Sequence, residues 1–145
     1  MTALPVPPSL PALPAYAELR CRSNFSFLQG ASWPEELVAR AKALGYSALA
    51  LADECSMAGM VRAHVAAKEH ALKLLVGSQF QVGGDAPFGL VVLACNRQGY
   101  GNLCEFITRL RRRSTKGSYA LHAADIDAAE LQHCVVIACA AHHSS

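Results

Sequence analysis

The sequence of 145 residues lacks any apolar run long enough to cross a membrane and any low-complexity segment after its first 15 residues. A spanning helix needs about 18 consecutive apolar residues, and the longest apolar stretches here, residues 89–95 and 134–141, have the length of strands. Charged residues make up 17% and hydrophobic residues 52% of the chain, a balance typical of a packed domain. These features exclude a membrane-spanning or disordered body, and the length allows one domain but not two.

Cysteine pairs with C-x-x-C spacing are also absent, although the chain has six cysteines. A disulfide scaffold or a zinc site is the alternative, but the aliphatic content and the position of most cysteines inside apolar runs favour buried thiols in a reducing cytoplasm. The first residues lack the positive and long apolar parts of a secretory signal and carry five prolines by position 14. We therefore expect a disordered, proline-rich lead-in over residues 1–15.

Positive charge is concentrated in one short segment. The chain has 13 basic and 11 acidic residues, and five of the basic ones lie between positions 109 and 116, so the remainder carries 8 basic against 11 acidic residues. Such a patch fits contact with nucleic-acid phosphates, and equally a solvated helix end that complements the helix dipole. The five residues are Arg109, Arg111, Arg112, Arg113 and Lys116.

Strand and helix patterns alternate along the chain. Ser32 and Glu35 form a capping box with Pro34 in the first turn, and Gly45 ends that helix. A second helix places His64 on an apolar face, where we expect a core residue rather than a metal ligand. The expected strands are 17–22, 46–52, a stretch within 72–82, 88–95 and 134–141. The expected helices follow Ser32, span about 57–70 and 100–110, and include a short one around 125–132. This order predicts one α/β domain over residues 16–145 with a mostly parallel sheet.

Polar residues follow three of the expected strands. In parallel α/β folds, sites form at the carboxyl ends of the strands, so we expect these side chains to converge on one cleft. Ser23 could be imagined as a nucleophile, but nothing around it has the form of a nucleophile elbow. The residues at the strand ends are Arg20, Arg22, Ser23, Asn24, Asp53, Glu54 and Gln79, and the histidines without metal-ligand spacing are His70, His122, His133, His142 and His143.

Three segments resemble a known family. They are AELRCRSNFSFLQGAS (17–32), AKALGYSALALADECSMAG (41–59) and LLVGSQF (74–80). These segments resemble the PHP (polymerase and histidinol phosphatase) domain that opens bacterial C-family DNA polymerases, over about residues 16–82 and more loosely to 119. The DECS segment and residues 62–69 resemble the error-prone, damage-inducible branch more than the replicative one.

The resemblance implies an incomplete, distorted TIM-like β/α barrel that is truncated before its end, because a closed barrel of this type needs about 200 residues or more. It implies a bacterial, cytoplasmic parent polymerase that extends primers on DNA past lesions with magnesium and accessory translesion proteins. For the chain itself it implies a scaffolding role without a cofactor. The alternatives are a metal-dependent phosphoesterase or exonuclease of the same superfamily and a non-catalytic protein-interaction module.

The family's metal ligands map onto residues of the wrong type. Active members use a His-x-His, an acidic residue, an Asp-His and a glutamate to bind divalent metals for phosphoester hydrolysis. These positions are Arg20 and Arg22, Asn24, Asp53 and Glu54, and Gln79. Arginine does not release its proton to bind a metal, and only Asp53 keeps a ligand type. We therefore expect no catalytic or metal-binding residue, and an arginine–carboxylate pair between positions 20 or 22 and 53 or 54, with Gln79 in the same cleft.

Overall fold

The computed structural model describes residues 4–5 and 14–140. The expected lead-in over residues 1–15 lies almost wholly outside the described residues, as do His142 and His143. Within the described part, no helix is long and apolar enough to cross a membrane.

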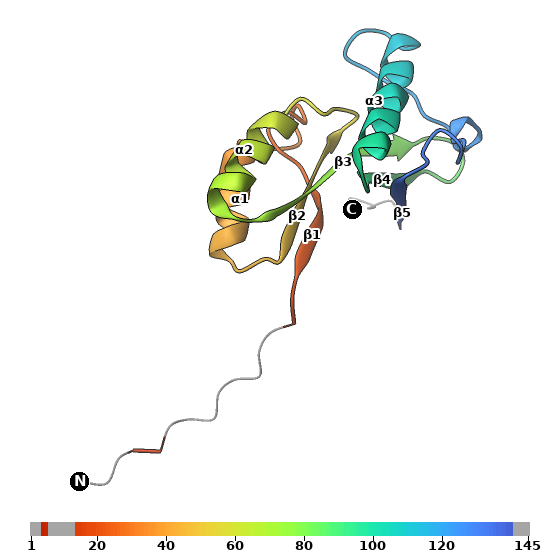
Figure 1. The fold of residues 1–145 in the computed structure, drawn as a ribbon. Coiled ribbons are helices and arrows are strands. Elements are labelled where there is room, and N and C mark those ends of the chain that lie inside the picture. Colours follow the sequence, from red (N-terminus) through yellow and green to blue (C-terminus); the bar gives the residue numbers. More distant parts are fainter. Residues whose placement is uncertain (1–3, 6–13, 141–145) are drawn as a thin grey trace.

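A curled sheet of five strands carries helices on one face (Figure 1). The strand order is β1-β2-β3-β4-β5. The elements in chain order are β1 (Ala17–Cys21), α1 (Pro34–Ala43), β2 (Ala48–Glu54), α2 (Met60–His70), β3 (Lys73–Val82), β4 (Phe88–Ala94), α3 (Arg97–Arg112), the 3-10 helix η1 (Ala123–Asp125) and β5 (Cys134–Ala140).

The sheet is mixed, whereas the sequence pattern predicted a mostly parallel one. β1, β2 and β3 are parallel, but β4 is antiparallel to both β3 and β5. The cause is the short turn between β3 and β4, which contains Gly83 and Gly84. A connection of that length can only reverse the chain, because a parallel crossover needs a dozen or more residues. Gly84 has a φ of +118°, a backbone conformation that favours glycine.

The alternation of side chains along β2 and β4 divides the core between the two faces of the sheet. Leu49 and Leu51 of β2 pack against α1 and α2, and Leu90 and Val92 of β4 pack against α3. The opposite, inner face of the curl is lined by a smaller apolar cluster of Ala50, Ala52, Val91 and Leu93. The helices therefore cover the outer face, and the carboxyl ends of β1, β2 and β3 meet at one edge.

The buried face of α2 is made of alanines, which corrects the expected placement of His64. Ala63, Ala66 and Ala67 are buried, whereas His64 is exposed and Val61 and Val65 are 73% and 50% exposed. Small side chains allow α2 to approach α1 closely, so the larger residues at the neighbouring positions turn outward. His64 is therefore a surface residue.

Two local expectations are shifted by the structure. The N-cap of α1 is Trp33 and not Ser32, because Pro34 occupies the first helical position, and only half of the expected capping box forms. The Trp33 N–H donates to the Glu36 carboxylate over 2.8 Å. The short helix expected around 125–132 is replaced by η1 and turns, because the Asp125 carboxylate accepts the N–H of His122 over 3.0 Å and fixes a tight 3-10 turn.

Candidate functional site

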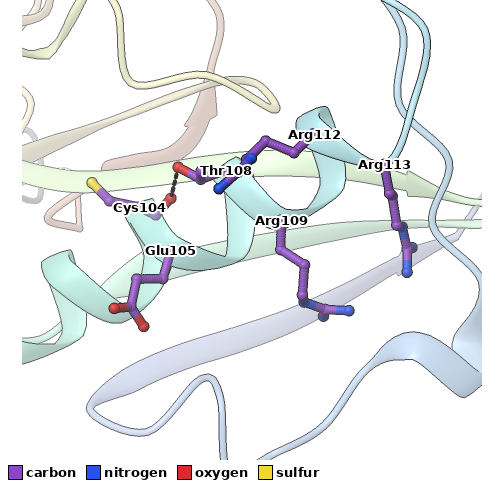
Figure 2. A pocket seen from close by; sticks show the side chains of 6 residues that line it. All are labelled: Cys104, Glu105, Thr108, Arg109, Arg112 and Arg113. Carbon is purple, nitrogen blue, oxygen red and sulfur yellow. Dashed lines mark hydrogen bonds between the residues drawn. The ribbon is translucent and has the colours of Figure 1, made fainter.

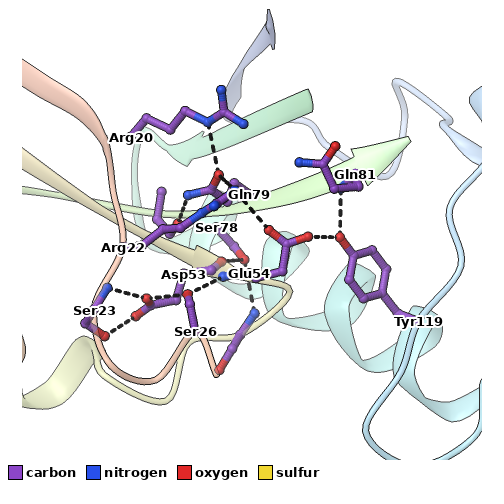
Figure 3. Close-up of polar contacts among 12 residues, drawn as sticks. Arg20, Arg22, Ser23, Ser26, Asp53, Glu54, Ser78, Gln79, Gln81 and Tyr119 are labelled. Atoms are coloured by element: carbon purple, nitrogen blue, oxygen red, sulfur yellow. Dashed lines mark hydrogen bonds and ion pairs between the residues drawn. The ribbon is translucent and has the colours of Figure 1, made fainter. Parts of the chain in front are cut away.

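The residues predicted at the strand ends gather in one cleft, with one exception (Figure 3). The parallel register of β2 and β3 sets Asp53 opposite Ser78 and Glu54 opposite Gln79. Arg20 and Arg22, at the end of β1, reach across to the same edge. Asn24 is the exception, because its N–H donates to the Ser32 carbonyl over 2.8 Å and its side chain makes no hydrogen bond among the described residues.

Asp53 is saturated by hydroxyl and amide donors rather than by arginine. Its Oδ1 accepts the Ser23 N–H and the Ser26 hydroxyl, and its Oδ2 accepts the Ser23 hydroxyl, each over 2.7 Å. The residue is only 2% exposed. Sequence reasoning considered Ser23 as a nucleophile and missed Ser26, whose only signal is its place in the loop after β1. The structure uses both serines to anchor that loop to β2.

Gln79 binds both arginines through one oxygen. Its Oε1 accepts Arg20 Nε over 3.0 Å and Arg22 Nη2 over 2.7 Å. Its Nε2 donates to the carbonyl of Ala52, so a fully buried amide has partners for both ends. A neutral amide suits this position because it offers a donor to β2 and an acceptor to β1 at once.

Arg22 and Glu54 form the arginine–carboxylate pair expected between the two loops. Arg22 Nη2 lies 3.5 Å from Glu54 Oε2, and the two side chains are 28% and 12% exposed. The other carboxylate oxygen accepts the hydroxyl of Tyr119, which itself accepts the N–H of Gln81 over 2.7 Å. Burial, followed by the hydrogen bond to Glu54, raises the pKa of Tyr119 above its usual value of 10.0.

Tyr119 was missed by sequence reasoning because it lies 65 residues from Glu54 along the chain. No spacing or periodicity connects the two positions. Arg111 brings the same distant segment to the cleft, since its Nε donates to the Cys55 carbonyl over 3.2 Å and its Nη2 to the Glu54 carbonyl over 3.4 Å. Its guanidinium lies 5.3 Å from the centre of the Tyr119 ring.

Two more arginines of the basic segment, whose side chains are drawn in Figure 2, bind carboxylates of this chain. Arg109 Nη2 lies 2.7 Å from the Glu130 carboxylate, and Arg113 Nη2 lies 3.0 Å from the Asp125 carboxylate. Arg112 points away from these two and, like Lys116, is exposed. The segment predicted as a phosphate-binding patch therefore has only part of its charge directed to solvent.

A cavity of about 660 Å³ opens beside the cleft. One wall is the loop between β1 and α1, including Phe25 and Phe27, and the other is the segment 117–122. Glu54 and Arg111 lie between the two walls. The cavity thus lies between the loop after β1 and segment 117–122, and Glu54 and Arg111 of the polar network line it.

The divalent metals implied by the family resemblance do not fit these residues. Guanidinium groups occupy two of the ligand positions, the Asp53 oxygens already accept three donors, and the Gln79 oxygen already accepts two. Among residues 4–5 and 14–140, no three His, Cys, Asp or Glu side chains are grouped so that they could hold a metal ion. The arrangement can carry charge pairing and hydrogen bonding between the strand ends.

Solved structures with a similar fold are known from two bacteria. A protein of Bifidobacterium adolescentis, provisionally assigned as a metal-dependent phosphoesterase, has a TM-score of 0.58 and 25% identity, with 70% of this chain and 34% of that chain covered. An amidohydrolase from Chromobacterium violaceum, with bound sulfate and no metal, has a TM-score of 0.58 and 27% identity, covering 68% of this chain and 34% of its own.

Curated relatives are more similar in sequence. The error-prone DNA polymerase of Bordetella parapertussis is 65% identical over 119 residues, which are 80% of this chain and 11% of the relative. That of Ralstonia nicotianae is 59% identical over 137 residues, 91% of this chain and 12% of the relative. The chain therefore spans about a ninth of the length of these relatives. Because the PHP domain profile matches residues 18–144, the chain belongs to the PHP domain family.

Proposed function

We propose that this chain is the N-terminal PHP portion of an error-prone DNA polymerase that acts in damage-induced translesion synthesis, and that it serves there as a scaffold. The observation that carries the scaffolding role is the network of hydrogen bonds and one ion pair at the strand ends. Arg22 binds both Gln79 and Glu54, and Asp53 binds the loop after β1 through three hydrogen bonds. These contacts join three strand ends and a loop, which is the structural task that a metal cluster performs in other proteins.

The polymerase assignment is supported by the names and the 59–65% identity of the relatives. Under this proposal, DNA, magnesium and accessory translesion proteins are partners of the whole polymerase, which works in the bacterial cytoplasm. The exposed Arg112 and Lys116 are the residues of the basic segment best placed to contact DNA phosphates. The side chains of Arg109, Arg111 and Arg113 are already engaged with carboxylates or carbonyls of this chain.

A metal-dependent phosphoesterase is the second candidate, favoured by the assignment of one structural neighbour. It requires neutral imidazoles or carboxylates where this chain has Arg20, Arg22 and Gln79. A third candidate, an interaction module for polymerase subunits or translesion factors, is compatible with the same scaffold.

Metal analysis and a phosphoesterase assay on the purified chain distinguish the first two candidates. We expect substoichiometric manganese and zinc after dialysis and no hydrolysis of a generic phosphodiester. Asp85→Ala, at an exposed carboxylate, is the matched control for Asp53→Ala. Tightly held metal at one or more ions per chain, or hydrolysis that Asp53→Ala removes and Asp85→Ala retains, contradicts the proposal.

A further inference from the structure

The turn after β2 has a backbone conformation that needs support. Cys55 has a φ of 45°, in the left-handed region that residues other than glycine rarely adopt. Its N–H donates to the Gln79 carbonyl over 2.9 Å, and the residue is 1% exposed. This conformation leaves the carbonyls of Glu54 and Cys55 to be satisfied from outside the sheet, and Arg111 of α3 donates to both.

The same guanidinium contacts the far wall of the cavity. Arg111 stacks on Tyr119, whose hydroxyl donates to Glu54. The Tyr119 ring also meets Phe80 edge-on at 6.2 Å, and the Leu121 carbonyl accepts the Gly83 N–H over 2.8 Å. Segment 113–121 is therefore fixed close to its end, and Arg111 joins it to the turn after β2 together with the hydrogen bond from Tyr119 to Glu54.

An arginine is suited to this position by its shape. Its planar guanidinium can donate to two carbonyls in one plane while its face lies against an aromatic ring. A lysine offers a single ammonium group and has no planar face. Three contacts on a half-buried side chain leave little of Arg111 available to a phosphate, although it belongs to the basic segment.

We infer that Arg111 is the positioning residue of the cleft, which holds the left-handed turn at Cys55 and the wall formed by residues 113–121 against each other. This role deepens the proposed scaffold, on which it rests, because Arg111 bridges the turn after β2, 56 residues earlier in the chain, and the ring of Tyr119. The Arg111 guanidinium also lies near the Cys55 thiol, and burial outweighs its effect and raises the pKa of that thiol to about 11.

Native-state alkylation of Cys55 tests the inference. The purified chain and its Arg111→Gln and Arg112→Gln variants are treated with iodoacetamide at one pH, and modification at each cysteine is followed by peptide mass spectrometry. We expect Cys55 to react at least tenfold faster in Arg111→Gln than in the wild type, and at the wild-type rate in Arg112→Gln. The exposed Cys95 reports the intrinsic reactivity in each sample.

Cys21 separates a local opening from general destabilisation, because it is partly buried on the far side of β2, in the cluster under α1 and α2. A wild-type rate at Cys55 in Arg111→Gln overturns the inference, and so does a parallel acceleration at Cys21. The experiment uses no metal and no phosphoester. If the alkylation result contradicts the role of Arg111, the scaffold proposal still stands or falls by the metal assay. If the wild type binds metal, the scaffold proposal is wrong, but the alkylation result is unaffected.

Discussion

At the scale of single residues, the cleft shows how a family position can keep its chemistry and change its task. Asp53 is the one position that retains a ligand type, yet its oxygens accept the backbone N–H and hydroxyl of Ser23 and the hydroxyl of Ser26. A carboxylate that accepts several buried donors stabilises them as long as it remains charged. Its removal leaves those donors buried and unpaired, which costs more than the hydrogen bonds themselves contributed.

Asp53→Ala should lower the free energy of unfolding by more than about 2 kcal/mol, since hydrogen bonds to charged groups contribute about 1.5–3 kcal/mol each and the donors stay buried. Urea unfolding followed by circular dichroism measures this change. Asp85→Ala, at an exposed site, should stay within about 0.5 kcal/mol of the wild type. Equal stability of the two variants would show that the serine–aspartate contacts do not anchor the loop.

Tyr119→Phe should reduce the loss of stability at alkaline pH. The pKa of Tyr119 is raised in the folded chain, so the stability it contributes is present below its usual pKa of 10.0 and is lost as pH rises above that value. The variant should be less stable than the wild type at about pH 8, and the difference should shrink towards about pH 11. Urea midpoints across this range measure it. The thiols of Cys21 and Cys55 also have raised pKa values, but they are present in both proteins and their effect cancels in the comparison. A difference in stability between wild type and variant that stays constant from about pH 8 to about pH 11 would contradict the prediction.

At the scale of elements, local signals in the sequence identified the segments better than their orientation. The spacing of Leu103, Phe106 and Leu110 predicted α3, and all three residues are buried. The short turn at Gly83 and Gly84 was enough to show that β4 runs antiparallel to β3. The apolar pattern of β5 does not show its direction, because fully apolar strands look alike in either direction. Sequence reasoning also misplaced the buried face of α2, since apolarity alone does not tell whether alanines or valines face the sheet.

The candidate site was predictable in some of its members and in few of its contacts. Sequence order placed Arg22, Glu54 and Gln79 at strand ends, and the structure joins them. It could not reveal that Arg111 and Tyr119 complete the cleft, because their position depends on how α3 packs and on the path of the segment after it. Contacts between distant parts of the chain follow from tertiary packing, which no local pattern encodes.

Two glycines in α3 offer a matched test of how this helix packs. A Cβ on Gly99 would lie 2.1 Å from the His133 carbonyl oxygen, whereas a Cβ on Gly101 would meet nothing within 4 Å. Gly99→Ala should therefore cost about 1–3 kcal/mol by forcing the segment before β5 away from α3. Gly101→Ala should stabilise the chain by about 0.5–1 kcal/mol through helix propensity. Thermal unfolding of both variants measures this contrast, and similar melting temperatures would show that α3 and His133 do not pack this closely.

At the scale of the whole molecule, some basic residues of segment 109–116 are paired within the chain and others are exposed to solvent. Arg109 and Arg113 hold the part of the chain that follows α3 through carboxylates and carbonyls, and Arg111 donates to the turn after β2. Arg112 and Lys116 are exposed. Exposed basic residues on a chain of low net charge act over short distances at physiological salt, because screening limits their reach to about 8 Å.

Replacing Arg112 and Lys116 with glutamine should weaken binding of duplex DNA to the purified chain and reduce the log–log salt slope by up to about 1.8, since each phosphate contact contributes about 0.9. Replacing Arg109 and Arg113 with glutamine removes the same charge but should affect mainly stability, because both are engaged with Glu130 and Asp125. Fluorescence anisotropy at several salt concentrations measures the slopes. The same reduction in both double variants would assign the whole segment to DNA contact.

The single oxygen that Gln79 offers to two arginines limits what a single substitution in this cleft can achieve. If position 79 alone changed to glutamate, the new carboxylate would lie between two guanidinium groups and pair with them instead of a metal. If Arg22 alone changed to histidine, Glu54 would lose its cationic neighbour and Gln79 one of its two donors. Neither single substitution creates a set of imidazole and carboxylate ligands, so a metal centre at these positions would require several substitutions at once. The hydrogen bonds that Gln79 makes to β1 and β2 would have to be replaced in the same change.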